Sequence, residues 1–338
     1  MKQKILYLFI AALFLSCKTQ PAAKIAEDAL WKLAEIGEFE PFADGGVLYL
    51  SIDAANSRPI LDLLAVGGAS VKDAAQILDR TSTITAALYP AGANRRFFAV
   101  LQGNYPKTIA DLSLKASSDW KKQRSETGAD YWRAEKNGLS VAFNERTIAA
   151  SDADPFLFAA ANTVPQGFDE FRQDAVITGW FGDGANAVNA FLAAMETPFE
   201  IQADRLFFRV ALKDEAYHIV LRVETPSADA ARGLSQLFSV ARLLGVKEIG
   251  EGDLGFFMST LFSNPPERNG ASLTLRLGPM NAARTALFFN IFGVLSFKTS
   301  QGARKMTIKK IAELPGVSTG TVDKFVYHRG GVSRGNRS

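Results

Sequence analysis

The sequence predicts an α+β protein made of duplicated units, each an antiparallel sheet with helices packed on one face. Three observations lead to this class. Short apolar runs of strand length alternate with segments whose apolar residues recur at helical spacing. Turn-forming residues separate neighbouring strands. A similar order of strands and helices occurs twice, within a composition of 47% hydrophobic and 22% charged residues that is typical of folded globular proteins.

The first unit is expected over residues 41–165, after a tether and short helix over 18–40 in which residues 28–37 have helical spacing. Its predicted strands cover 47–52, 83–89, 96–102, 130–134 and 139–143, and its predicted helices cover 71–80 and 106–114. The segment Lys136-Asn137-Gly138 predicts a tight hairpin turn, because Asn-Gly supplies the positive φ angles that such a turn needs.

The second unit is expected over residues 166–302 and repeats this order. Its predicted strands cover 175–181, 205–212, 217–223 and 271–277, and its predicted helices cover 185–195, 227–244 and 282–295. The second and third of these strands form a hairpin that turns at Lys213-Asp214-Glu215. An internal duplication accounts for the repeated order, and two unrelated α+β units are the alternative.

The N-terminus has the features of an export signal. Lys2 and Lys4 precede an apolar run over residues 5–15, which closes on Ser16 and Cys17. The run is too short for a transmembrane helix, which needs roughly 20 residues. The segment 13–17 resembles the lipobox of bacterial lipoproteins, and this resemblance implies a signal peptide over residues 1–17 with a diacylglycerol on Cys17. An ordinary signal peptide with an incidental cysteine is the alternative.

Residue types that commonly carry catalysis or bind metals are scarce. Cys17 is the one cysteine, which excludes an internal disulfide and a multi-cysteine metal site. Only His218 and His328 could serve a histidine-based triad or metal site. The glycines of 179–184 lack the spacing of a phosphate loop and indicate a strand-to-helix turn, and the acidic residues of 248–253 indicate a solvated turn. We therefore expect no catalytic residues, no cofactor and no metal.

The C-terminal segment 303–338 is basic. From Arg304 onward it contains eight basic and two acidic residues, a net charge of +6 against +3 for the whole chain. Such a concentration of positive charge favours nucleic acid or an anionic membrane as a partner.

Residues 306–332 of this segment resemble the helix-turn-helix of lac-repressor (LacI) family regulators. The first helix begins at Thr307-Ile308-Lys309, Gly316 gives the turn, and Ser318 would cap the recognition helix. The resemblance implies DNA contacts from the start of that helix. The implied contact residues are Ser318, Thr319, Gly320, Thr321 and Lys324. A basic amphipathic tail without this history is the alternative.

Two functional hypotheses follow. The first is a bacterial lipoprotein of the cell envelope, anchored to membrane lipid through Cys17, whose body is monomeric and has a non-catalytic binding or structural role. The ligand of that body is not named by the sequence. The second is a DNA-binding transcriptional regulator of LacI type that acts through residues 306–332. Export separates the two, because an exported body does not meet the chromosome.

Overall fold

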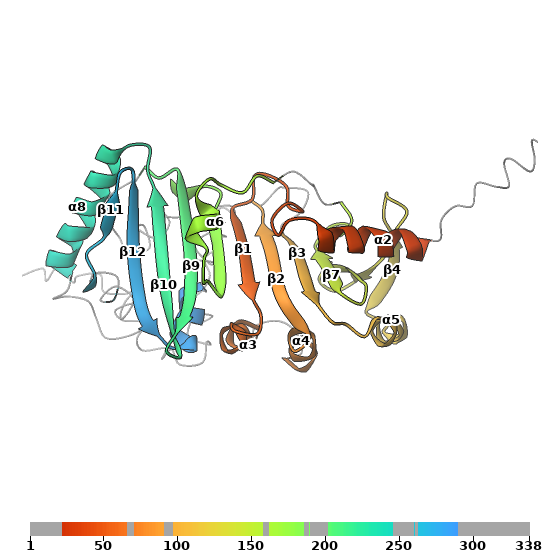
Figure 1. Ribbon diagram of the computed structural model, residues 1–338. Helices are drawn as coiled ribbons and strands as arrows, with labels where there is room; N and C mark the ends of the chain where they lie inside the picture. Colours follow the sequence, from red (N-terminus) through yellow and green to blue (C-terminus); the bar gives the residue numbers. More distant parts are fainter. Residues whose placement is uncertain are drawn as a thin grey trace, which may run out of the picture. The chain divides into compact units, whose positions relative to one another are not determined.

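The computed structural model describes residues 22–65, 71–90, 97–157, 162–185, 202–245 and 263–289, together with residues 189 and 260 (Figure 1). The chain divides into two compact units. The first contains the described residues up to Arg58 and from Ala65 to Asp169, and the second contains Pro59–Leu64 and the described residues from Glu170 onward. Helices and antiparallel strands occur in both, so the predicted α+β class is confirmed.

The first unit is an open antiparallel sheet with the strand order β1-β2-β3-β7-β6-β5-β4. Its strands are β1 (Leu48–Asp53), β2 (Thr81–Leu88), β3 (Phe97–Gly103), β4 (Trp120–Arg124), β5 (Asp130–Ala134), β6 (Ser140–Phe143) and β7 (Thr147–Ser151). Its helices are α2 (Ala22–Glu35), α4 (Val71–Leu78) and α5 (Lys107–Ala116). Most of α3 (Arg58–Ala65) belongs to the second unit.

Aromatic side chains cover one face of this sheet. Alternate residues of β3 point to opposite faces, and Phe98 and Val100 are buried whereas their neighbours are half-buried. The ring of Phe42 packs edge-on against Phe98 with centroids 5.7 Å apart, and Phe39 packs against Phe168 at the same separation. Helix α2 adds the buried Leu30 and Leu33 and contacts β5, β6 and β7. This face is therefore a closed hydrophobic core.

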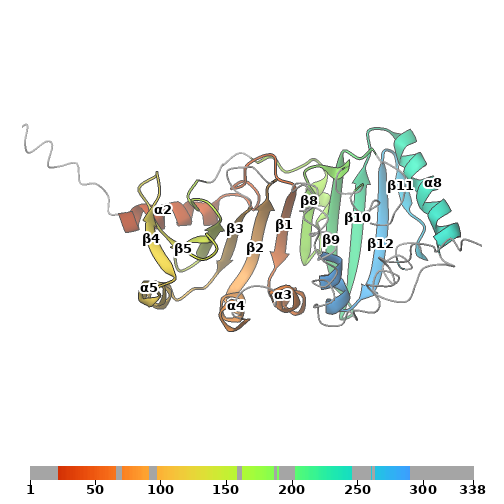
Figure 2. The same ribbon diagram turned by 180° about the vertical axis from the view of Figure 1, so that it is seen from behind.

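The second unit is an antiparallel sheet with the order β11-β12-β10-β9-β8 (Figure 2). Its strands are β8 (Ile177–Phe181), β9 (Arg205–Lys213), β10 (Ala216–Glu224), β11 (Glu267–Asn269) and β12 (Ser272–Met280). Its helices are α6 (Phe168–Phe171), which spans the boundary between the units, α8 (Ala228–Gly245) and a segment over residues 282–289. Phe208 packs against Phe289 with ring centroids 5.9 Å apart, so residues 282–289 help to bury one face of the sheet.

The structure confirms most predicted elements and extends several. Helix α2 begins at Ala22, within the expected tether, because residues 22–26 contain three alanines, which favour helix. Gly138 has φ 72° and the hairpin turn of β9 and β10 has φ 50° at Asp214 and 62° at Glu215, as tight turns require. Of the predicted helix 185–195, residues 185 and 189 are helical, and the remaining residues lie outside the described part of the chain.

Five elements have no counterpart in the sequence prediction. They are α3, α6, β4, β7 and β11. Strand β4 has the sequence WKKQR and is almost wholly exposed, so it lacks the alternation that marks a half-buried strand. Strand β7 is built from small residues, and β11 is only three residues long and exposed. Pairing with a neighbouring strand determines the conformation of each of these three strands.

Candidate functional site

The residues predicted to carry lipid or DNA lie outside the described part of the chain. These are Cys17 and the tail residues Ser318, Thr319, Gly320, Thr321 and Lys324. His328 and the acidic segment 248–253 also lie outside the described residues. His218 is half-buried on β10, opposite Ala211 of β9. Of the predicted glycine turn, Gly184 lies against Arg205, where an added Cβ would come within 2.5 Å of the Arg205 backbone. That glycine therefore has a packing role.

The described residues offer neither a cluster of metal ligands nor a membrane-spanning helix. They contain no group of three or more His, Cys, Asp or Glu side chains that could hold a metal ion. None of their helices is long and apolar enough to cross a membrane. The surfaces that stand out are instead an apolar helix surface in the first unit and an arginine-rich sheet face in the second.

Helix α5 turns its apolar side chains toward solvent. None of its ten residues is buried, and Ile109 and Leu112 are 65% and 61% exposed. Residues three apart lie on the same side of a helix, so these two side chains form one apolar ridge. A helix on a protein surface usually turns such residues inward. The α5 ridge, Ile109 and Leu112, therefore has a contact surface that the fold of this unit does not use.

Polar contacts from other elements hold α5 in this orientation. The Trp132 indole Nε1 on β5 donates a hydrogen bond of 3.1 Å to Asp111 Oδ1. The Lys107 ammonium lies 3.0 Å from Glu27 Oε2 of α2. Lys107 and Asp111 lie on the side of α5 away from the ridge, because successive residues of a helix are rotated by about 100° about its axis. The exposure of the ridge is thus supported by the structure around it.

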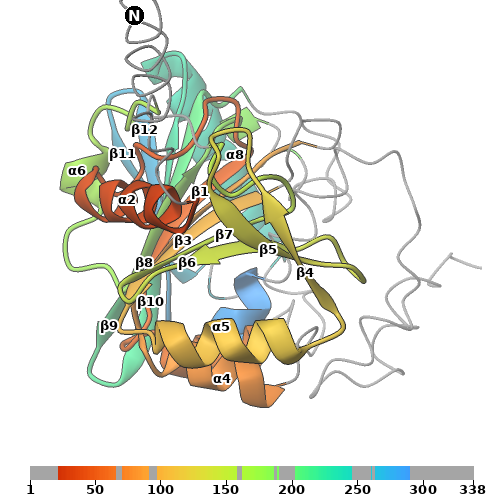
Figure 3. The same ribbon diagram turned by 90° about the vertical axis from the view of Figure 1, so that its right-hand side faces the viewer.

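Helix α4 lies at the same edge of the first unit as α5. Figure 3 shows both helices below the strands, and Figure 1 shows α4 under β2 and α5 further along the same edge, toward β4. Ile77 of α4 is 42% exposed. Solvent-facing apolar residues therefore occur on two helices along this edge of the first unit.

In the second unit, cross-strand pairing gathers arginines on one sheet face. Arg222 of β10 lies opposite Phe207 of β9 and Thr274 of β12. Directly opposite residues share a face, so the arginine face contains Arg205, Arg209, Arg222 and Arg276, with Glu224 and Glu267 among them. The other face of the same strands carries the buried Phe208, Ile219 and Leu273. The arginine face also carries the buried Phe207 and Val220, so its charged groups lie beside apolar side chains.

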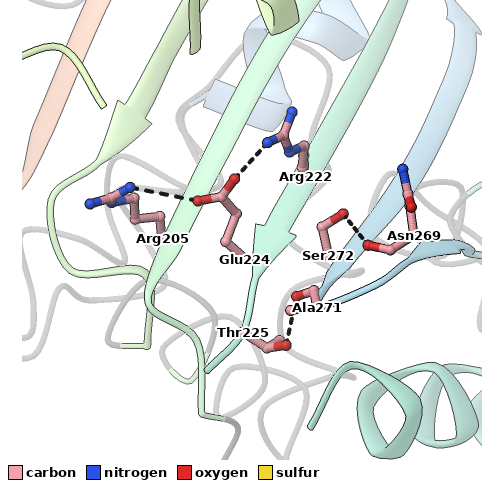
Figure 4. A network of polar contacts seen from close by, with 7 residues as sticks. All are labelled: Arg205, Arg222, Glu224, Thr225, Asn269, Ala271 and Ser272. Carbon is pink, nitrogen blue, oxygen red and sulfur yellow. Dashed lines mark hydrogen bonds and ion pairs between the residues drawn. The ribbon is translucent and has the colours of Figure 1, made fainter. Parts of the chain in front are cut away.

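Glu224 is shared between two arginines at the end of β10 (Figure 4). Its Oε1 accepts from Arg222 Nη2 at 2.6 Å, and its Oε2 lies 3.8 Å from Arg205 Nη1. Beyond it, Thr225 Oγ1 donates to the Ala271 carbonyl at 2.7 Å, which fixes the start of β12. One carboxylate thus serves two guanidinium groups that are 46% and 26% exposed.

A second carboxylate neutralises Arg276. Glu267 of β11 accepts from Arg276 Nε and Nη2 at 3.1 and 3.0 Å, a bidentate pair. This hydrogen bond holds the pKa of Glu267 below its ordinary value and raises the pKa of Arg276. Arg276 therefore has a full partner of its own on the arginine face.

Arg209 has no carboxylate partner among the described residues. Its Nη1 donates to the Phe171 and Gln173 carbonyls at 3.1 and 2.9 Å. The guanidinium groups of Arg209 and Arg222 both lie over the Phe171 ring, at 5.5 and 5.9 Å from its centroid. The buried Nε atoms of both arginines lack a hydrogen-bond partner. Stacking on one aromatic ring thus holds two cations together on neighbouring strands.

These features of the described residues define a class of protein. It is a two-unit α+β protein with an exposed apolar helix in one unit and an arginine-rich sheet face in the other. The export signal that the sequence predicts before this body is typical of a protein of the bacterial envelope.

Comparison with known proteins sharpens this class. Residues 34–149 match the family described as outer membrane-associated lipoprotein TP0453. The match bears out the lipoprotein class and the predicted localisation in the cell envelope. It ends at residue 149, far from residues 306–332, so DNA binding by the tail stays a prediction. No curated protein sequence matches the chain.

Three solved structures of TP0453 resemble this fold. Crystal form I gives a TM-score of 0.56 at 15% identity and covers 77% of this chain and 98% of that chain. Crystal form III gives 0.55 at 15% identity, covering 75% and 98%. Crystal form IV gives 0.54 at 15% identity, covering 77% and 98%. At this level of identity the likeness concerns the fold alone.

Proposed function

We propose that this chain is a lipoprotein, anchored by a lipid on Cys17, whose body makes a second, reversible contact with the bilayer surface through the α5 ridge. The single observation that carries the proposal is the exposure of Ile109 and Leu112 on a helix that buries none of its residues. The occupant proposed for this surface is a membrane because the family that matches residues 34–149 is described as outer membrane-associated.

The strength of the contact follows from its size. Fully burying a Leu or Ile side chain contributes about 1.5–3 kcal/mol, and the two side chains are already about one-third covered. The ridge alone therefore gives weak binding. A lipid on Cys17 would keep the ridge close to the bilayer, so that even a weak contact is occupied much of the time.

We further propose that the body is not catalytic. Of the two histidines only His218 falls in the described residues, and it lies within a strand between Ala211 and the neighbouring β12. The alternative function, DNA binding of LacI type through residues 306–332, rests on the sequence resemblance of the tail. It has no support from the fold of the body.

The test uses the full chain with Cys17→Ala, so that only the body can bind. Flotation with phosphatidylcholine vesicles should show weak, salt-insensitive binding, because the ridge is uncharged. The double change Ile109→Ser and Leu112→Ser should lower the partition coefficient about tenfold or more, which corresponds to the loss of two buried apolar side chains.

The matched control is Leu212→Ser on β9, another exposed leucine, with 39% of its surface accessible. It should leave vesicle binding unchanged. Equal binding by the α5 double variant and the Cys17→Ala parent would overturn the membrane contact. In cells, labelled palmitate should mark the wild-type chain and not Cys17→Ala, and labelling of Cys17→Ala would overturn the anchor.

A further inference from the structure

We propose that the arginine face of the second unit binds the phosphate group of an anionic phospholipid, through Arg209 and Arg222 as the principal contacts. The inference deepens the proposed function, since it rests on a body held at a bilayer. It concerns a different unit and a different chemistry from the α5 ridge, so the two can fail separately.

Positive charge exceeds negative charge along the strands of this face. Four arginines share the face with two glutamates. Glu267 is taken up by Arg276, and Glu224 is divided between Arg205 and Arg222. Arg209 is left with main-chain carbonyls as its hydrogen-bond acceptors. Within the described strands the face therefore has more cations than anions, and an added anion would relieve the repulsion between them.

Arg209 and Arg222 are close neighbours on this face. The register places Arg209 opposite Val220 and Arg222 opposite Phe207, so the two arginines are diagonal neighbours on adjacent strands. Such neighbours are about 7–8 Å apart at the backbone, within reach of one ligand for side chains as long as arginine. A guanidinium group presents its donors as a planar fork that suits phosphate oxygens. One phosphate can thus contact both side chains.

Aromatic rings hold both guanidinium groups in place before a ligand binds. Phe171 lies beneath both guanidinium groups, and Phe207 lies 5.4 Å from that of Arg222. The two rings also pack on each other with centroids 5.8 Å apart. Arginines held by stacking lose less conformational entropy when they bind than freely rotating side chains do. Both remain partly exposed, so a ligand can reach them.

Exposed acidic residues near α6, Asp169, Glu170 and Asp174, limit the strength of this site. They follow or precede Phe171 in the chain and oppose the approach of any anion to the surrounding surface. We therefore expect a modest affinity that falls with salt, in contrast with the salt-insensitive contact of the α5 ridge.

The experiment compares vesicles of phosphatidylcholine with vesicles that contain phosphatidylglycerol, again with the full Cys17→Ala chain. Phosphatidylglycerol should increase binding. The double change Arg209→Gln and Arg222→Gln should remove most of that increase. Binding to vesicles that contain phosphatidylglycerol should fall about fivefold for each arginine that is replaced. Glu224→Gln should raise it instead, because it releases Arg222 and Arg205 from their shared carboxylate.

Two controls match these charge changes. Arg268→Gln on β11 removes a positive charge from a residue opposite Leu273, on the other face of the strands. Glu126→Gln removes an exposed negative charge in the first unit. Neither should change the phosphatidylglycerol-dependent increase by more than about twofold. If the Arg268→Gln control lost as much phosphatidylglycerol-dependent binding as the arginine double variant, the binding would be a general charge effect and the proposed site would be overturned.

The source of the phosphate is tested separately, by thermal unfolding with inorganic phosphate and with glycerol phosphate. Stabilisation by these salts without any phosphatidylglycerol-dependent binding would overturn the lipid as ligand. Binding to phosphatidylcholine that persists without a phosphatidylglycerol increase would sink this inference and leave the α5 contact intact. Retained phosphatidylcholine binding by the arginine double variant also shows that its first unit is folded.

Discussion

The two units use the same order of elements, yet the helix that follows the central hairpin behaves differently in each. In both, a strand is followed by helical residues, a hairpin (β2–β3 or β9–β10), a helix (α5 or α8), and a last strand that pairs with the second strand of the hairpin. Helix α8 buries Ala231, Leu234 and Phe238, whereas α5 buries nothing. Position in the fold therefore does not decide whether an amphipathic helix packs.

The difference has a visible structural counterpart. The first unit inserts the hairpin β4–β5 between its helix and its last two strands, and α5 contacts β4, the outermost strand. The described residues of the second unit show no such hairpin after α8, and α8 contacts β11 and β12. The shared order is the pattern that a duplication would leave, and the added hairpin gives α5 a narrow, polar support in place of a broad apolar one.

The largest expected effect contrasts the two helices directly. Leu234→Ala in α8 removes a side chain that is 3% exposed and should lower the free energy of unfolding by about 2–4 kcal/mol. Leu112→Ala in α5 removes one that is 61% exposed and should change it by less than about 0.5 kcal/mol. Urea denaturation of both variants measures the contrast. A comparable loss in Leu112→Ala would show that the ridge packs within the protein.

The sequence predicts which residues form α5 but not where the helix faces. Apolar residues at helical spacing indicate one apolar side, and for α8 that side is buried, as usual. For α5 the support comes from Asp111 bonding to Trp132 and from Lys107 pairing with Glu27, residues far apart in the chain. Such long-range contacts leave no local signal in the sequence.

The sequence does not predict the arginine face either. Alternation within β9 places Arg205, Phe207 and Arg209 on one side, which a single strand can reveal. The match of these residues with Arg222 and Arg276 depends on the register of β9, β10 and β12. A shift of one residue would move Arg222 to the opposite face, so only the paired sheet shows the cluster.

An effect of intermediate size is expected in the pH dependence of stability, because Tyr49 is buried in the core of the first unit. Burial raises the pKa of Tyr49 to about 12, because the phenolate loses its solvation, although the hydrogen bond from Gly46 lowers the pKa in part. A group with a raised pKa favours the folded state below its ordinary value of 10.0, and stability falls as the pH rises above that value toward about 12. The loss over this range is on the order of 1–2 kcal/mol.

Tyr49→Phe should remove this part of the alkaline loss while costing about 1 kcal/mol at neutral pH, since the Tyr49 hydroxyl also donates to the Ala43 carbonyl at 2.7 Å. Unfolding free energies at several values between pH 8 and pH 11 give the two slopes. Tyr217→Phe in the second unit is a parallel case, because burial raises the pKa of Tyr217 as well. It should also reduce the alkaline loss of stability. Parallel curves for Tyr49→Phe and the wild type would contradict the assignment.

The smallest expected effect concerns the outer strand of the second unit. Arg276 holds the pKa of Glu267 below its ordinary value, so this pair favours the folded state above about pH 4.5 and the contribution disappears as the pH falls through the lowered pKa. Glu267 is 62% exposed and solvent screens the pair, which limits its worth to less than about 1 kcal/mol. An NMR titration of the Glu267 carboxyl carbon should show the lowered midpoint, and Arg276→Gln should return it to the ordinary range. A midpoint that stays low in Arg276→Gln would mean that another cation of the arginine face reaches Glu267, and the division of the two carboxylates among the four arginines would have to be redrawn.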